Sequence, residues 1–290
     1  MSELRKLMND QMLLKGFSER TKQSYLSAVS LLARYYHLPP DKLSHKDIQN
    51  WFLYLIKERK LSPATCRQYL NGLRFFYLHV LCWSSFQVKF TVPKKTQKIP
   101  DLLSSKEVRL IIEHATYPKY RMIFIVSYTC GLRLSELVAL KVKHIHGDEH
   151  YLQVVQGKGF KDRNIPLPLS TLKALREYWL LYHPDTFLFA GRDLGKPLSP
   201  TSVQKHYTQT KSRAGIKKKG GIHALRHAFA SHQLAAGMPI HQLKNILGHT
   251  DIKSTERYLH WSPEADDNNR SIDLLCHDLL CRAPGGKADE

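Results

Sequence analysis

Helical spacing of apolar residues runs through most of this chain and gives way to a strand pattern in one short stretch. Within residues 48–55, four large apolar side chains lie at i, i+3, i+4 and i+7, which predicts one buried helix face. Residues 151–155 and 163–167 instead predict two short strands, joined by the turn QGKGFKD. Helical patterns resume at about Thr171. The sequence therefore predicts a mainly α-helical protein with a small antiparallel β-sheet.

Breaks in this pattern divide the chain into domains. Residues 84–105 lose the periodicity and are rich in prolines and basic side chains, which is typical of an extended linker. Ser104 and Glu107 then have the spacing of a capping box that opens a new helix. We expect a helical domain over 1–84, a linker over 85–104, an α+β domain over 105–267, and a C-terminal helix and tail over 268–290.

Local signals predict where individual helices begin. Ser44 stands three residues before an acidic residue, and Ser62 is followed by a proline that suits the first helical turn. Residues 122–130 are apolar nearly all round, as in a buried helix. We expect Ser135 to cap the helix that follows, over residues 136–141.

The chain carries a large positive charge. Its 290 residues include 44 Lys and Arg against 25 Asp and Glu, so the formal net charge is +19. Such an excess repels itself in a compact fold unless a polyanion is the usual partner. Nucleic acid is the leading candidate and an anionic membrane surface the second, while a merely basic soluble protein is the alternative. No apolar run reaches the roughly 18 residues of a membrane span.

Cysteine and histidine usage bears on compartment and cofactors. The five cysteines are odd in number and scattered, which favours a reducing cytoplasm over a disulfide framework. The 16 histidines fall in no HExxH or CxxC…H arrangement, so we expect polar contacts or proton transfer from them and no metal site.

Two basic regions are candidates for DNA contact. Arg67, Asn71 and Arg74 recur at i, i+4 and i+7 on the polar side of a predicted helix. A solvated helix face would have the same pattern, but the net charge favours phosphate contact. Lys161 and Arg163, within and just after the predicted turn, are further expected DNA contacts.

The segment from residue 222 to residue 258 concentrates chemically active side chains. His223 and Arg226 share one face of a predicted helix, His249 follows the glycine that ends the next helix, and Tyr258 comes nine residues later. Each has an ordinary alternative: a hydrogen-bonded surface histidine, an arginine paired with an acid, a helix C-cap and a half-buried aromatic. Residues 223–248 would also suit a helix-turn-helix that only binds DNA.

Five motifs in one order make the combination specific. They are H-x-x-R-H at 223–227, L-G-H at 247–249, a tyrosine at 258, G-L-R-x-S-E at 131–136, and G-K-G at 157–159. With these motifs the chain resembles the tyrosine recombinase, or phage integrase, family, of the Xer-like, transposon or phage integrase type. The resemblance covers the second domain and implies a catalytic domain there. It extends loosely to the first domain, which is similar to the family's helical core-binding domain.

The resemblance also implies a reaction. Tyr258 would attack a DNA phosphate to give a 3′-phosphotyrosine and a free 5′-hydroxyl, without metal or ATP. A phenol with a pKa of ~10 is mostly protonated at neutral pH and needs help to attack. Arg133 and Arg226 would hold the scissile phosphate, because guanidinium makes forked bonds to phosphate oxygens. His223 would be the base or a hydrogen-bonding group near the tyrosine.

The remaining expected roles are secondary to these. His249 would donate to a non-bridging phosphate oxygen, and Glu136 would support the arginines. Lys158, between two glycines at the predicted turn, would protonate the leaving 5′-oxygen. An ordinary basic turn residue is the alternative for Lys158.

Partners and location follow from the same resemblance. It implies double-stranded DNA recombination sites, a tetramer on DNA, possible accessory DNA-bending proteins, no membrane and no cofactor. The location would be bacterial cytoplasm, associated with the nucleoid. Ile272, Leu275 and Leu279 share one face of the predicted C-terminal helix, which would dock on a neighbouring protomer or on its own domain.

Two other functions remain open at this point. A type IB topoisomerase shares the tyrosine and arginine chemistry but only relaxes supercoils. A non-catalytic DNA-binding regulator could keep the fold without the reaction.

Overall fold

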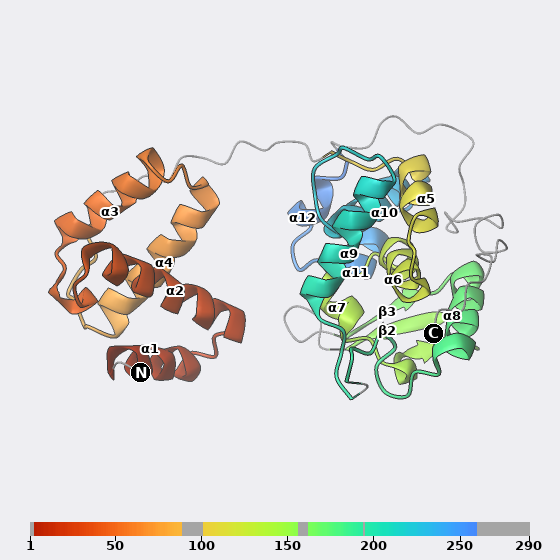
Figure 1. Ribbon diagram of the computed structural model, residues 1–290, viewed down its shortest axis with the longest axis horizontal. Helices are drawn as coiled ribbons and strands as arrows, with labels where there is room; N and C mark the ends of the chain where they lie inside the picture. Colours follow the sequence, from red (N-terminus) through yellow and green to blue (C-terminus); the bar gives the residue numbers. More distant parts are fainter. Residues whose placement is uncertain (1–2, 89–100, 156–161, 194, 260–290) are drawn as a thin grey trace. The chain divides into compact units, whose positions relative to one another are not determined.

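The chain forms two compact units, Met1–Lys98 and Ile99–Glu290 (Figure 1). The structure is a computed structural model that describes residues 3–88, 101–155, 162–193 and 195–259. The central part of the expected linker, the tip of the expected turn with Lys158 and Lys161, and the expected C-terminal helix lie outside these ranges.

The first unit is entirely helical in its described part. Its two longest helices, α2 and α4, pack against each other, and α1 and α3 complete the core with Trp51 and Phe52 buried. The sequence signals for helix starts are confirmed, because Ser44 forms a capping box with Asp47 and Ser62 caps the first turn of the last helix. The elements are α1 (Glu3–Leu14), α2 (Glu19–Tyr36), η1 (Pro40–Lys42), α3 (His45–Lys57) and α4 (Pro63–His79).

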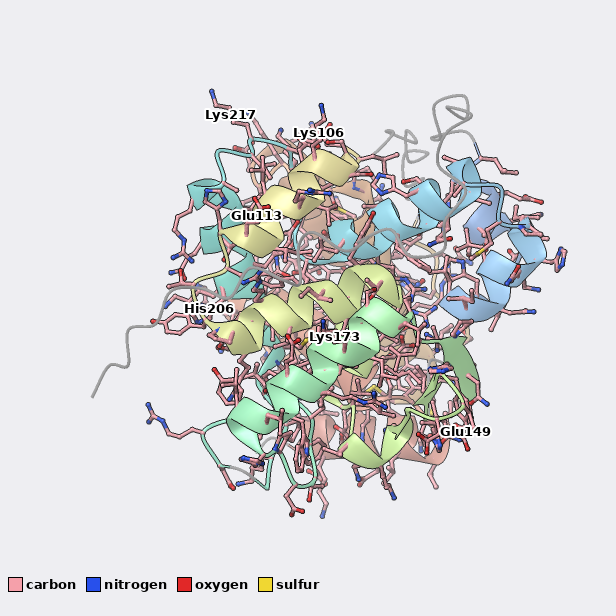
Figure 2. All side chains as sticks on the ribbon, turned by 90° about the vertical axis from the view of Figure 1, so that its right-hand side faces the viewer. Lys106, Glu113, Glu149, Lys173, His206 and Lys217 are labelled. Atoms are coloured by element: carbon pink, nitrogen blue, oxygen red, sulfur yellow. The ribbon has the colours of Figure 1, made fainter. Side chains whose placement is uncertain are left out.

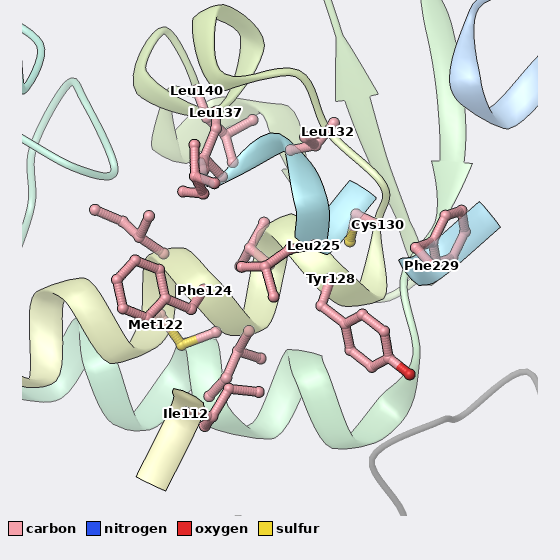
Figure 3. Packing of buried hydrophobic residues seen from close by; sticks show 14 of the residues in the cluster. Ile112, Met122, Phe124, Tyr128, Cys130, Leu132, Leu137, Leu140, Leu225 and Phe229 are labelled. Carbon is pink, nitrogen blue, oxygen red and sulfur yellow. The ribbon is translucent and has the colours of Figure 1, made fainter. Parts of the chain in front are cut away.

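The second unit surrounds one buried helix, as the apolar run at 122–130 predicts. This helix, α6, packs against α5, α8, α9 and α10. Figure 3 shows Met122, Phe124 and Tyr128 of α6 in the core together with Leu225 of α10. The helices are α5 (Ser105–Glu113), α6 (Pro118–Thr129), α7 (Leu134–Val138), η2 (Val142–His144), α8 (Leu169–Tyr182), α9 (Pro200–Arg213), α10 (His223–Ala235), α11 (Ile240–Leu247) and α12 (Lys253–Glu256).

A three-stranded antiparallel sheet forms the β part of this unit. Strands β1 (Ile145–His146), β2 (Tyr151–Val154) and β3 (Arg163–Pro166) are ordered β1-β2-β3. Leu152 pairs with Ile145 on one side and with Ile165 on the other. The predicted pair of strands is confirmed, and β1 is an addition, because two residues are too few to show an alternation in the sequence. The predicted fold class, mainly α with a small antiparallel sheet, is confirmed.

The expected cap at Ser135 is wrong. Helix α7 begins two residues earlier than expected, at Leu134, and ends at Val138, and Arg133 is its N-cap. The carboxylate of Glu136 accepts the backbone N–H of Arg133 at 2.9 Å, so an acidic side chain at the third helical position satisfies the free donor. Ser135 therefore lies inside the helix.

The outer surface of the second unit is densely charged. Figure 2 shows Lys106, Lys217 and Glu149 pointing outward from different elements, and all three are exposed. In the part of the chain that the structure describes, no helix is both long and apolar enough to cross a membrane. No group of three or more His, Cys, Asp or Glu side chains with metal-binding geometry occurs in that part either.

Candidate active site

Two glycines in left-handed conformation present backbone carbonyls to two arginines. Gly131, with φ +59°, follows α6, and Gly248, with φ +62°, ends α11. The Gly131 carbonyl accepts a bond of 2.7 Å from Nη1 of Arg226, and the Gly248 carbonyl accepts one of 2.9 Å from Nη2 of Arg133. Left-handed backbone is readily adopted by glycine, so these turns bring Arg133 and Arg226 together from distant parts of the sequence.

The carboxylate of Glu136 lies between this pair of arginines and a third one, Arg163. Its Oε1 accepts from Nη1 of Arg133 at 2.8 Å, and its two oxygens accept from Nη1 and Nη2 of Arg163 at 3.0 and 2.8 Å. Nη1 of Arg226 lies 3.9 Å from Oε2. Burial alone would raise the pKa of Glu136, but the bonds and charges of Arg163 and Arg133 lower this pKa to about 2. The carboxylate is therefore ionised at neutral pH, as a support for the arginines requires.

Arg163 lies in the interior and departs from the expectation of a DNA contact. Its guanidinium forms the fork with Glu136, and its Nε donates to the Ile246 carbonyl at 2.8 Å. Its side chain is 11% exposed. The strand alternation contains a signal for this, because Arg163 lies on the same face of β3 as the buried Ile165. This placement favours a supporting role for Arg163 over the expected DNA contact, and the motif comparison did not single this residue out.

Arg226 is the most buried cation of this cluster. Its side chain is 1% exposed, and its Nη2 donates to the Leu247 carbonyl at 2.7 Å. Burial and the neighbouring Arg133 lower the pKa of Arg226 to about 9. The guanidinium thus remains charged at neutral pH and is held in place by backbone carbonyls.

His249 is placed between Arg226 and α12. Nη2 of Arg226 lies 3.1 Å from Nε2 of His249, and Nδ1 of His249 lies 2.8 Å from Oγ1 of Thr255. Because a guanidinium can only donate, Nε2 accepts and Nδ1 carries the proton. Burial and Arg226 lower the pKa of His249 to about 4, which agrees with a neutral ring. To donate to a phosphate as expected, Nε2 would have to gain a proton once DNA is bound.

Tyr258 lies beside these groups with its ring 3% exposed. Its Oη is 2.9 Å from Nδ1 of His227, a histidine of the H-x-x-R-H motif to which we had given no role. The ring is stacked at 6° to the ring of His249, with centroids 6.4 Å apart. Burial raises the pKa of Tyr258, while Arg226, Arg257 and Arg133 act to lower it. The hydroxyl is therefore protonated in this arrangement.

His223 begins α10 one turn before His227. The two rings are in edge-to-face contact with centroids 5.1 Å apart. His223 is exposed at the surface, but partial desolvation of its ring by neighbouring atoms lowers its pKa, as do Arg226 and Arg133, and Glu136 opposes them. The structure thus brings together His223, Arg226, Arg133, His249, Glu136 and Tyr258, while Lys158 lies outside the described residues.

A hollow of about 350 Å³ opens next to this cluster. Gly248 and His249 form the side toward the arginines, and the rest of its lining comes from Asp162, Arg163, Lys244, Asn245 and Thr250. A cationic recess of this kind suits an anionic group.

The expected DNA contacts of the first unit lie at its surface. Arg67 and Asn71 line a hollow of about 430 Å³ between the first turns of α2 and α4, together with Arg20 and Gln68. The guanidinium of Arg74 lies over the ring of Phe86, 6.0 Å from its centroid. All three side chains are exposed, and their role in DNA binding stays a prediction.

Comparison with known proteins identifies the family. Residues 101–265 match the model of the phage integrase family, and residues 4–83 match the N-terminal SAM-like domain of phage integrases. The chain therefore belongs to the phage integrase family, the family of the tyrosine recombinases.

Individual relatives agree with this assignment. The chain is 36% identical over 261 residues to a protein of Sinorhizobium fredii named as an integrase/recombinase, covering 89% of this chain and 84% of that one. It is 30% identical to the tyrosine recombinase XerD of Oceanobacillus iheyensis, covering 85% and 89%. Among solved structures, a lambda integrase dimer bound to a core site superposes with a TM-score of 0.71 at 19% identity, covering 87% and 95%, and supports the fold.

Proposed function

We propose that this chain breaks and rejoins DNA strands at specific sites through a covalent 3′-phosphotyrosine bond to Tyr258. The observation that carries this proposal is the convergence of Arg133, Arg226, His249 and Tyr258 on one side of the second unit. Two guanidinium groups, a neutral imidazole and a protonated phenol are the groups needed to attack a phosphodiester without a metal.

The arginines would carry the charge of the transition state. A DNA phosphodiester has one negative charge, and attack adds a second as phosphorus becomes five-coordinate. Arg133 and Arg226 are fixed in advance by backbone carbonyls and by Glu136, so little reorganisation is needed when that charge develops. Removal of one preorganised donor of this type typically slows such reactions about a hundred- to a thousandfold.

Strand exchange follows from the tyrosine ester. The ester conserves the energy of the broken phosphodiester, so a 5′-hydroxyl from another strand can reverse the reaction without ATP. His223 and His249 would hydrogen-bond to the phosphate, and Lys158 would protonate the leaving 5′-oxygen. Energy conservation in the ester is what separates recombination from simple DNA cleavage.

The partner would be double-stranded DNA carrying a recombination site. The lambda integrase relative is a dimer bound to a core site, and a XerH recombinase has been solved with its difH substrate. By analogy this chain would assemble on two sites, as a tetramer, and accessory DNA-bending proteins could assist it. We place it in the bacterial cytoplasm at the nucleoid. Docking of residues 268–290 on a neighbouring protomer would link the subunits.

Supercoiled plasmids with one or two copies of the site test this function. The site would be located by footprinting the chain on the DNA that flanks its own gene. We expect recombinant products from the two-site plasmid. Relaxation of both plasmids without recombinants would instead support topoisomerase activity, and binding without any change in the DNA would support a regulator.

A further inference from the structure

His227 makes a direct contact with the atom expected to attack DNA. Its Nδ1 lies 2.9 Å from Oη of Tyr258, and the two rings are tilted at 47°. His227 lies on α10 directly after Arg226, and the carbonyl of His227 accepts from Oγ of Ser231 at 3.1 Å. The helix therefore holds this imidazole at the phenol before DNA arrives.

We propose that His227 is a catalytic residue of the proposed recombination reaction and takes the proton of Tyr258 when the phenol attacks. The assignment rests on the function proposed above and gives the base role to His227 in place of His223. In the arrangement that the structure shows, the phenol needs an acceptor for its proton, and Nδ1 of His227 is at hydrogen-bond distance from it.

The surroundings of His227 keep its ring ready to accept a proton. Among the groups that act on it are His223 and Arg226 on α10, and Arg257 and Tyr258 on the segment that follows α12. Burial is the largest cause, followed by His223, Arg226 and Arg257, and together they lower the pKa of His227 to about 4. The ring is therefore neutral at physiological pH, with one nitrogen able to accept.

Bound DNA would make this weak base stronger. The phosphate brings negative charge next to Arg226 and Arg133, which offsets the cations that disfavour protonation of His227. The pKa of His227 would rise only when a phosphate is in place. Tyr258 would accordingly become nucleophilic on DNA and remain protonated in its absence.

The chemical step balances with groups already named. The Oη–H bond of Tyr258 breaks and its proton passes to Nδ1 of His227, while Oη forms a bond to phosphorus. The bond between phosphorus and the 5′-oxygen breaks, and that oxygen takes a proton from the Lys158 ammonium or from water. In resealing, the 5′-hydroxyl returns its proton to the neutral amine of Lys158 or to hydroxide, and its oxygen forms a bond to phosphorus. The bond between phosphorus and Oη breaks, and Oη recovers its proton from His227.

The same helix contains a matched control. His232, one turn and one residue further along α10, contacts Oη of Tyr128 through its Nδ1 at 2.8 Å. Both histidines are thus partly buried and lie at hydrogen-bond distance from a tyrosine, but Tyr128 belongs to the core helix α6. His227→Asn and His232→Asn each keep a polar side chain near the tyrosine and remove the ability to take a proton.

Single-turnover formation of the covalent adduct tests the assignment. The full chain would be mixed with a nicked duplex of its own site, which releases a short 5′-hydroxyl strand and traps the adduct. We expect His227→Asn to slow adduct formation by about a hundredfold or more, and His232→Asn to leave the rate unchanged. A rate for His227→Asn equal to wild type would overturn the assignment. No adduct with wild type would reject the proposed function itself.

A phenol that ionises more easily at position 258 would show whether His227 accepts a proton or only positions the ring. With 3,5-difluorotyrosine incorporated at position 258, the phenol ionises near neutral pH and no longer depends on a base. We expect His227→Asn to lose much less activity in this background than with tyrosine. An equal loss in both backgrounds would show that His227 only positions or stabilises the ring, and would overturn its role as base. Melting curves would show whether each variant is folded.

Discussion

Glu136 and Arg163 form a buried ion pair with two hydrogen bonds, and Glu136 also accepts a hydrogen bond from Arg133. Charged groups at 5% and 11% exposure are costly unless each is paired and hydrogen-bonded. Here four donors of two arginines, counting the backbone N–H of Arg133, converge on one carboxylate. Changes at single residues of this network should therefore affect stability as well as activity.

Glu136→Gln should cost stability in a pH-dependent way. The pKa of Glu136 is about 2 in the fold against 4.5 for an ordinary glutamate, so its ionisation stabilises the fold fully above about pH 4.5. That stabilisation, about 3 kcal/mol, is lost as pH falls from 4.5 toward 2. In urea unfolding, the difference in free energy of unfolding between wild type and variant should be largest near neutral pH. It should become smaller as the pH is lowered to about 3.

The exposed Glu113 on α5 provides the control for this measurement. Glu113→Gln should leave the free energy of unfolding nearly unchanged at every pH. If the free energy of unfolding of Glu136→Gln differed from that of wild type by the same amount from neutral to acid pH, an ionised, paired Glu136 would be contradicted.

The variant Arg163→Ala should show whether Arg163 supports the buried ion-pair network or contacts DNA directly. Breaking a buried ion pair by removing one partner typically costs about 3–5 kcal/mol, and Arg163 also loses its bond to the Ile246 carbonyl. We expect lower stability and slower cleavage, with the salt dependence of DNA affinity unchanged. Lys161→Ala, at an expected DNA contact, should instead reduce the slope of log affinity against log salt by about 0.9. An equal slope change for Arg163→Ala would restore it as a phosphate contact.

Motif order in the sequence indicates the candidate residues but not their partners. Arg133, Arg226, His249 and Tyr258 were expected from the family resemblance that their motifs carry, and the structure brings them together. His227 was passed over because two histidines flank the motif arginine, and the sequence does not show which ring faces the tyrosine. That choice depends on where the segment after α12 returns to α10, which no local pattern encodes.

At the scale of elements, the turn at the end of α11 fixes the geometry of the cluster. Gly248 is in left-handed conformation, its carbonyl receives Arg133, and a Cβ there would lie 2.9 Å from Nη1 of Arg163. The turn thus needs glycine for its backbone and for the space that a guanidinium occupies.

Gly248→Ala should therefore harm activity beyond its effect on stability. Left-handed alanine costs about 1–2 kcal/mol, and displacement of Arg163 and Arg133 should slow adduct formation by about a hundredfold. Gly237→Ala is the matched control: φ is +89° and a Cβ there would meet no atom within 4 Å. It should lower the melting temperature while leaving the adduct rate per folded molecule intact. Similar rates for both variants would contradict the role assigned to Gly248.

The sequence predicts the start of a helix correctly where the capping side chain bonds only to backbone groups within its own first turn. Ser44 and Ser62 cap helices as expected, because the donors they satisfy lie within one turn. The start of α7 differs, since Glu136 caps Arg133 while it also binds Arg163 from β3. Strand β1 is only two residues long and is defined by its pairing with β2. Elements that depend on distant partners were the ones that the sequence could not specify.

At the scale of the whole molecule, a net charge of +19 predicts a DNA affinity that depends strongly on salt. We expect the first unit to contribute to DNA binding through the hollow lined by Arg67, Asn71 and Arg20. Polar and cationic side chains at two helix starts suit contact with backbone phosphates.

Arg67→Ala in the full chain should reduce the slope of log affinity against log salt by about 0.9, as expected for one lost phosphate contact. Lys57→Ala, at an exposed position on α3 outside the hollow, should leave the slope as it is. Once DNA is saturated, the adduct rate should be the same for both variants and wild type. A slower adduct rate for Arg67→Ala at saturating DNA would show that Arg67 takes part in the chemical step. An unchanged slope of log affinity against log salt would show that Arg67 does not contact a phosphate.

The most direct measurement is the identity of the atom that becomes joined to DNA. The full chain is incubated with the nicked duplex of its own site, digested with protease and nuclease, and the peptides are weighed by mass spectrometry. We expect the peptide that contains Tyr258 to carry a 3′-nucleotide phosphate, and Tyr258→Phe to form no adduct. An adduct on another residue, or strand joining by Tyr258→Phe at the wild-type rate, would contradict the proposed reaction.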